Sequence, residues 1–285
     1  MSDIPVDIPP ALPSAPKTRA PAGTTDTHFH IFGPKDKYPL SPQRMYEPAL
    51  ADVDQYLAMA EIVGIERVVI VNGSPYGADN RCILDAIQTF GAHRARGVAV
   101  VENDISDAGL RALHDQGIRG IRFNLITNMT TIGDLRQTIG RLAAHGLHAQ
   151  LWLKSHVLED ILSIIDQIDV PVVLDHMGQV PTSLGMDHPH FQNMMRLLET
   201  GKVWVKMIGY RVSEGAPFDD LRAPVAEIMR RIPERMIWGT DWPHPLLKGM
   251  PMPDDGRMLD LLASWCTETQ LKQILVDNPA RLYGF

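Results

Sequence analysis

Short apolar segments alternate along this chain with longer segments of helical period, and the alternation repeats eight times. Runs such as VVIV and VPVVLD are apolar at every position, which is typical of strands covered on both faces in a parallel sheet. The predicted strands are 26–32, 67–71, 96–101, 118–123, 147–153, 170–175, 202–207 and 235–240. The predicted helices are 50–64, 78–90, 106–116, 132–145, 157–167, 189–200, 218–231 and 255–264.

This order of elements predicts an α/β protein with a single (β/α)8 TIM-type barrel over residues 24–285. A doubly wound open sheet is the main alternative, but its first strand usually leads into a glycine-rich phosphate turn. Here the first strand ends in HIFGP, which favours the barrel. Gly64 and Gly146 stand where helices are expected to stop. Residues 1–23 hold six prolines and are predicted to form an extended or disordered N-terminal arm.

Charge and composition exclude several classes of partner. The formal net charge is −7 and basic runs are short, which argues against nucleic acid or an anionic membrane surface. No segment reaches the roughly 18 apolar residues of a membrane span, and the N-terminus lacks a signal-peptide pattern. The two cysteines belong to no C-x-x-C motif, so a reduced cytoplasmic protein is expected. No sequence pattern predicts the oligomeric state.

Polar residues follow several of the predicted strands, at the barrel end where active sites lie. The expected site residues at these strand ends are His28, His30, Arg122, His176 and Asp241. Because side chains alternate along a strand, Asp26, His28 and His30 are expected to share one face. By the same rule Asp175 is expected to point away from the face that carries His176.

Two arginines indicate what the site binds. Arg122 lies near the end of the fourth predicted strand, and Arg211 follows the seventh, in KMIGYR. A guanidinium is a planar fork that fits a carboxylate with two hydrogen bonds. The pair therefore predicts a small anionic substrate that carries a carboxylate.

Five motifs together carry a family resemblance: THFHIFGP, RGIRFN, DHMG, WGTDWPHP and the terminal NPARLYGF. They resemble the amidohydrolase superfamily, and within it the 2-pyrone-4,6-dicarboxylate hydrolases and related lactone hydrolases. The similarity runs from about residue 23 to the C-terminus. It implies a distorted (β/α)8 barrel that opens a lactone ring without a metal.

The resemblance also implies roles for individual residues. Asp241 matches the aspartate that activates water, and the three histidines match those that face the lactone carbonyl. Further matches imply substrate contacts for Arg122, Arg211, Tyr46 and Ser74. At three substrate-binding positions this chain differs from the pyrone hydrolases, and it has Asn128, Trp152 and Gln179 there. These differences favour a lactone with fewer or differently placed acid groups than the pyrone dicarboxylate.

Lactone hydrolysis needs an activated water, donors for the developing oxyanion and a clamp on the substrate. Asp241 is expected to act as general base, and best if partial burial raises its pKa. His28, His30 and His176 are expected to donate hydrogen bonds to the carbonyl oxygen.

A metal site is the competing interpretation of the same residues. His28, His30, His176 and Asp241 form a sound ligand set for a divalent metal such as zinc. The cationic Arg122 stands where a fourth-strand ligand is expected, so the metal-free mechanism is favoured. Two further alternatives stay open: a sugar-acid (aldarolactone) hydrolase or isomerase of the same fold, and a metal-dependent decarboxylase or hydratase.

Overall fold

A computed structural model describes residues 4–126, 131–247 and 249–285. Eight parallel strands pair in sequence order around a barrel, which confirms the predicted fold class. All eight predicted strands are present, with ends shifted by a few residues. Their bounds are β1 Thr25–Phe29, β2 Arg67–Val71, β3 Ala95–Ala99, β4 Ile118–Asn124, β5 His148–Trp152, β6 Val172–Leu174, β7 Val203–Met207 and β8 Met236–Trp238.

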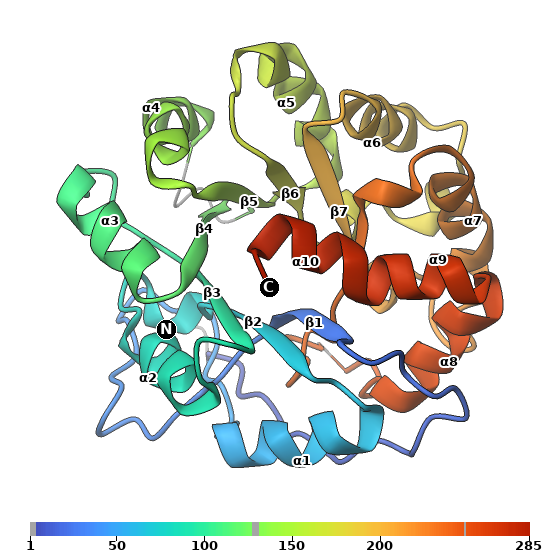
Figure 1. Cartoon of the computed structure of the whole chain (residues 1–285), viewed down its shortest axis with the longest axis horizontal. Coiled ribbons are helices and arrows are strands. Elements are labelled where there is room, and N and C mark those ends of the chain that lie inside the picture. Colours follow the sequence, from blue (N-terminus) through green and yellow to red (C-terminus); the bar gives the residue numbers. More distant parts are fainter. Residues whose placement is uncertain (1–3, 127–130, 248) are drawn as a thin grey trace.

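Helices surround the strands, one after each strand (Figure 1). They are α1 Val53–Val63, α2 Arg81–Phe90, α3 Asp107–Asp115, α4 Ile132–Leu142, α5 Leu158–Ile164, α6 Pro189–Glu199, α7 Arg222–Arg231 and α8 Asp255–Trp265. Gly64 ends α1 in a left-handed conformation, as predicted. Gly146 does the same for the short 3₁₀ turn that continues α4. None of the helices in the described ranges is long and apolar enough to span a membrane.

Two helices at the C-terminus were not predicted, α9 Glu268–Lys272 and α10 Asn278–Tyr283. Figure 1 shows α10 crossing one end of the barrel, with the C-terminus near its centre. Tyr283 is fully buried there among side chains of the barrel interior, including Val69, Val173 and Ile237. These short helices lack a long apolar period, so the sequence pattern did not reveal them.

The Asp26 side chain is one of the links across the seam between β1 and β8. Its Oδ1 accepts hydrogen bonds from the backbone N–H groups of His28 and Thr240, each at 3.0 Å. Its Oδ2 accepts from the Thr240 hydroxyl at 2.6 Å and from the Tyr56 hydroxyl of α1 at 3.0 Å. Burial raises the pKa of Asp26 to about 6, against the effect of these hydrogen bonds. At this seam, therefore, side-chain hydrogen bonds from Asp26 add to the backbone hydrogen bonds that join the strands.

The expectation that Asp26 shares a face with His28 is wrong. The pairing of β1 with β2 shifts register between Asp26 and Phe29. Such an irregularity breaks the two-residue alternation of side chains. Asp26 consequently bonds to Tyr56 on a surrounding helix, while His28 turns into the barrel, where its ring lies 5.0 Å from that of His176.

Gly239 lies at the tightest approach across this seam. A Cβ at this position would lie 2.9 Å from the backbone nitrogen and 2.8 Å from Cβ of His28. Because backbone cannot yield as a side-chain end does, we expect Gly239→Ala to destabilise the fold by about 1–3 kcal/mol in urea unfolding. Gly140→Ala in α4 is the matched control, since its Cβ meets nothing within 4 Å, and we expect it to stabilise by up to about 1 kcal/mol. Equal stability of both variants would contradict this account of the seam.

The N-terminal arm lies against the outside of the barrel and is tied to it by hydrogen bonds. Ser14 donates from its N–H and hydroxyl to Asp254, and the N–H groups of Lys17 and Thr18 donate to Asp260 of α8. Nearer its start, the Asp7 carboxylate accepts from the Leu246 N–H in the loop after β8. The arm thus reaches from α8 to the loops that surround the candidate site.

Candidate active site

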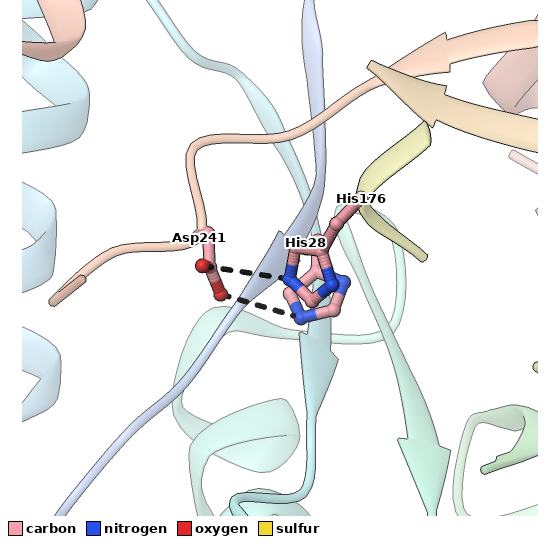
Figure 2. A group of neighbouring side chains, drawn as sticks. All are labelled: His28, His176 and Asp241. Atoms are coloured by element: carbon pink, nitrogen blue, oxygen red, sulfur yellow. Dashed lines mark ion pairs between the residues drawn. The ribbon is translucent and has the colours of Figure 1, made fainter. Parts of the chain in front are cut away.

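Three histidines and one aspartate from three segments converge at the carboxyl end of the barrel. Oδ1 of Asp241 lies 3.5 Å from Nε2 of His28 and 3.4 Å from Nε2 of His30. Its Oδ2 lies 3.5 Å from Nε2 of His176. Figure 2 shows His28 and His176 facing the same carboxylate. All four side chains are buried, as the sequence interpretation requires of a common site.

Two of these residues have backbone conformations that L-amino acids seldom adopt. The φ angle is 62° at Asp241 and 48° at His176, both directly beyond the end of a barrel strand. A further hydrogen bond, from the Asp241 N–H to the His28 carbonyl, fixes the loop after β8 against the first strand. Left-handed conformations of this kind persist only where the surroundings enforce them, and they concentrate at functional sites.

The Asp241 carboxylate is held by two donors from the loop after β7. Its Oδ2 accepts from the Tyr210 hydroxyl at 2.6 Å and from Nε and Nη2 of Arg211 at 2.7 and 2.6 Å. Burial alone raises the pKa of Asp241, but the Arg211 charge and the nearby imidazoles outweigh it and hold this pKa well below its ordinary value. The condition under which Asp241 was expected to work best, a pKa raised by burial, is therefore not met, because Arg211 pairs with this residue.

The surroundings of the histidines indicate the charge of two rings, His28 and His176, and the tautomer of the third, His30. Burial lowers the pKa of His28 well below its usual value and also lowers the pKa of His176, so both rings are neutral near pH 7. Nδ1 of His30 lies 2.8 Å from the Val71 carbonyl, which only accepts, so this nitrogen carries the hydrogen. When neutral, His30 therefore presents a lone pair at Nε2 toward Asp241.

A second buried cluster lies beside His28, and sequence reasoning missed most of it. Asp175 accepts from Nε and Nη2 of Arg122, both at 3.1 Å, and lies 3.7 Å from Nζ of Lys206. Lys206 also donates to Gln150 Oε1 at 2.7 Å. Burial raises the pKa of Asp175, but His28, Arg122 and Lys206 reverse the effect and hold it well below its ordinary value. Burial lowers the pKa of Lys206 to about 8.

The prediction for Asp175 failed because β6 ends at Leu174 and the chain then turns. Strand alternation does not apply beyond that residue, so Asp175 and His176 both lie in the site. One signal for Lys206 was available, since it is the charged residue inside the otherwise apolar strand VWVKM. Gln150 is likewise a polar residue within β5.

The structure describes all but one of the expected substrate-binding residues. Trp152 stacks under Arg122, whose Cζ is 4.9 Å from a Trp152 ring centroid. Burial and the Asp7 charge raise the pKa of Tyr46, while hydrogen bonding with Ser74 opposes the shift. Gln179 is partly exposed at the loop after β6. Asn128 lies outside the described residues.

The distances between the donor atoms of these side chains also suit a bound metal ion. Ligand atoms of His28, His176 and Asp241 lie within 4.8 Å of one another, and neighbouring donors are 3.4–3.5 Å apart. Zinc ligands at about 2.0–2.1 Å in a tetrahedron have about this separation. The charge of the site opposes metal binding, because three cationic side chains surround its two carboxylates. These side chains are Arg122, Arg211 and Lys206.

The chain is a (β/α)8 barrel whose imidazoles and carboxylates gather at the carboxyl ends of the strands. This arrangement is that of an enzyme with its active site at the usual end of such a barrel. Residues 25–285 match the amidohydrolase family, and the chain belongs to that family.

Individual relatives match almost the whole chain. It is 37% identical to a 2-pyrone-4,6-dicarboxylate hydrolase of Comamonas testosteroni, covering 96% of this chain and 94% of the relative. It is 35% identical to a 4-sulfomuconolactone hydrolase of Rhizobium radiobacter, covering 96% and 95%. The crystal structure of a putative 2-pyrone-4,6-dicarboxylic acid hydrolase from Pseudomonas putida is 28% identical, with a TM-score of 0.81 over 92% of this chain and 97% of that chain.

Proposed function

We propose that this enzyme hydrolyses a carboxylate-bearing lactone, with Asp241 activating the attacking water and without a metal. The observation that carries the proposal is the convergence of His28, His30 and His176 on Asp241, with Arg122 beside them. Two relatives that are more than a third identical over nearly the whole chain bear the names of lactone hydrolases, which supports the substrate class.

In the proposed reaction the water lies between Asp241 and the lactone carbonyl carbon. Arg211 and Tyr210 engage Oδ2 of Asp241, so Oδ1 is the oxygen that takes the proton. His30 accepts a second hydrogen bond from the water, because its Nδ1–H is taken by Val71. This role differs from the donor role that the sequence suggested for His30.

His28 and His176 then stabilise the oxyanion that forms on the carbonyl oxygen. Removing one such donor typically lowers kcat by about 10²–10³-fold. Arg122 orients the substrate: Nε and Nη2 bind Asp175, and Nη1, which bonds to no residue within the described ranges, binds a substrate carboxylate. The substrate we propose is a pyrone- or muconolactone-like ring, with Trp152 flanking it and the neutral Gln179 at one of the positions that differ from the pyrone hydrolases.

Ring opening in water enriched in ¹⁸O tests the reaction type. A panel of muconolactones, pyrone carboxylates and aldarolactones is incubated with the enzyme, and the masses of the products are measured by mass spectrometry. We expect one ¹⁸O atom in the new carboxylate of a muconolactone- or pyrone-type product. Turnover of an aldarolactone without ¹⁸O uptake would instead indicate an isomerase, and loss of CO₂ would indicate a decarboxylase.

A metal-dependent reaction is the second candidate, and the ligand spacing around Asp241 is the observation in its favour. His28, His176 and Asp241 would hold the ion, with His30 alongside, and a bound zinc would lower the pKa of a water ligand. We expect enzyme dialysed against a chelator to keep its kcat and to contain less than stoichiometric zinc by elemental analysis. Activity that is lost with the metal and restored by zinc alone would overturn the metal-free mechanism.

A further inference from the structure

We propose that Lys206 is a positioning residue that fixes the tautomer of His28, so that His28 presents an N–H group at Nε2. Its use for the lactone carbonyl rests on the proposed function, but the tautomer itself is a property of the resting protein. Lys206 lies on β7, and its side chain is fully buried.

In the hydrogen bond between Lys206 and His28, only Lys206 can be the donor. Nζ of Lys206 lies 3.3 Å from Nδ1 of His28 and 2.7 Å from Oε1 of Gln150, which anchors it. An ammonium group has only donors, so Nδ1 of His28 accepts. A neutral imidazole that accepts at Nδ1 carries its hydrogen on Nε2.

Asp175 competes for the same ring nitrogen and favours the opposite tautomer. Its Oδ1 lies 3.2 Å from Nδ1 of His28, and a carboxylate at that distance would accept from an Nδ1–H. However, among the described residues the contact of Asp175 Oδ1 with this ring does not have the geometry of a hydrogen bond, whereas the contact of Lys206 Nζ does. Arg122 holds the other oxygen of Asp175 through Nε and Nη2. The geometry therefore favours Lys206 over Asp175 as the partner of Nδ1.

This tautomer determines what the opposite ring nitrogen of His28, Nε2, can bind. Nε2 of His28 is buried and faces Oδ1 of Asp241 at 3.5 Å, without the geometry of a hydrogen bond among the described residues. Its hydrogen can therefore turn to a substrate oxygen placed beside that carboxylate. A protonated ring nitrogen offers no lone pair to a metal ion. Lys206 therefore makes His28 an oxyanion donor and at the same time a poor metal ligand.

The test reads the tautomer directly, in the full-length protein with ¹⁵N-labelled histidine. The ring nitrogen signals of His28 are assigned by difference against His28→Gln. We expect wild type to be protonated at Nε2 and Lys206→Met to be protonated at Nδ1. We also expect kcat of Lys206→Met to fall by about 10²-fold with KM nearly unchanged, as for loss of one oxyanion donor. Nδ1 protonation in wild type, or no change in Lys206→Met, would overturn the inference.

Lys202→Met is the matched control, because Lys202 lies next to the same strand and binds the carbonyls of Ile165, Asp166 and Ile168 instead. We expect neither its His28 tautomer nor its kcat to change. If Lys206→Met does not fold, Gln150→Leu removes the anchor of the ammonium, and a shift of His28 toward Nδ1 protonation is expected. A His28 tautomer that stays on Nε2 in Gln150→Leu then counts against the inference. Because the spectra need no substrate, they decide the tautomer even if the lactonase proposal fails.

Discussion

Replacing Asp241 with asparagine is expected to lower kcat for lactone hydrolysis by about 10³- to 10⁴-fold, with KM changed only a few-fold. The amide has no basic oxygen for the proton of the attacking water, while its size and position are nearly those of the carboxylate. Steady-state kinetics on the best substrate of the lactone panel measure the loss, and circular dichroism checks that the barrel is retained. Full activity in Asp241→Asn would show that another group is the base.

Asp254→Asn is the control for this experiment. Its carboxylate binds Ser14 of the arm on the outside of the barrel, so we expect kcat to remain unchanged. The pH dependence gives a second check. Because Arg211 holds the pKa of Asp241 well below 3.8, its carboxylate stays ionised down to that pH, and kcat should not fall through protonation of Asp241 above it. An acidic limb at higher pH must then come from another group.

Replacing Asp175 with asparagine is expected to lower the free energy of unfolding by about 3–5 kcal/mol, the usual result of removing one partner from a buried ion pair. Asp175 is the carboxylate that neutralises both Arg122 and Lys206, and its side chain is fully buried. Without it, Arg122 and Lys206 lose the carboxylate that contacts both of them, and only the more distant charges of Asp26 and Asp241 act on Lys206. Urea unfolding followed by tryptophan fluorescence measures the change.

The double variant Asp175→Asn with Lys206→Met separates charge from packing. It removes one of the two unpaired cations and puts an apolar side chain of similar length in its place. We therefore expect it to recover part of the stability lost in Asp175→Asn alone. If the double variant is as unstable as the sum of the two single variants, the cost does not arise from the unpaired charge of Lys206.

The sequence predicted the barrel well because its signals are local. Each apolar run and each helical period arises from residues within one segment, and eight such units in order leave few alternatives to a closed parallel barrel. The same holds for His28, His30, His176 and Asp241, since each lies at or just beyond a strand end that the sequence located. Their meeting at one carboxylate follows from the rule that parallel strands bring their ends together.

The partners of these residues were decided only by the tertiary structure. Arg122 binds Asp175 across 53 residues of sequence and Lys206 reaches His28 across 178, and no local pattern encodes such pairs. The sequence suggested a substrate contact for Arg211 but did not reveal that this arginine also pairs with Asp241 and lowers the pKa of that carboxyl, which burial alone would raise. Sequence by itself therefore determined that His28, His30, His176 and Asp241 reach the mouth of the barrel, but not that Asp175 and Lys206 join them. Packing decided their charges and tautomers, because these depend on burial and on neighbours that only the closed barrel brings within a few ångströms.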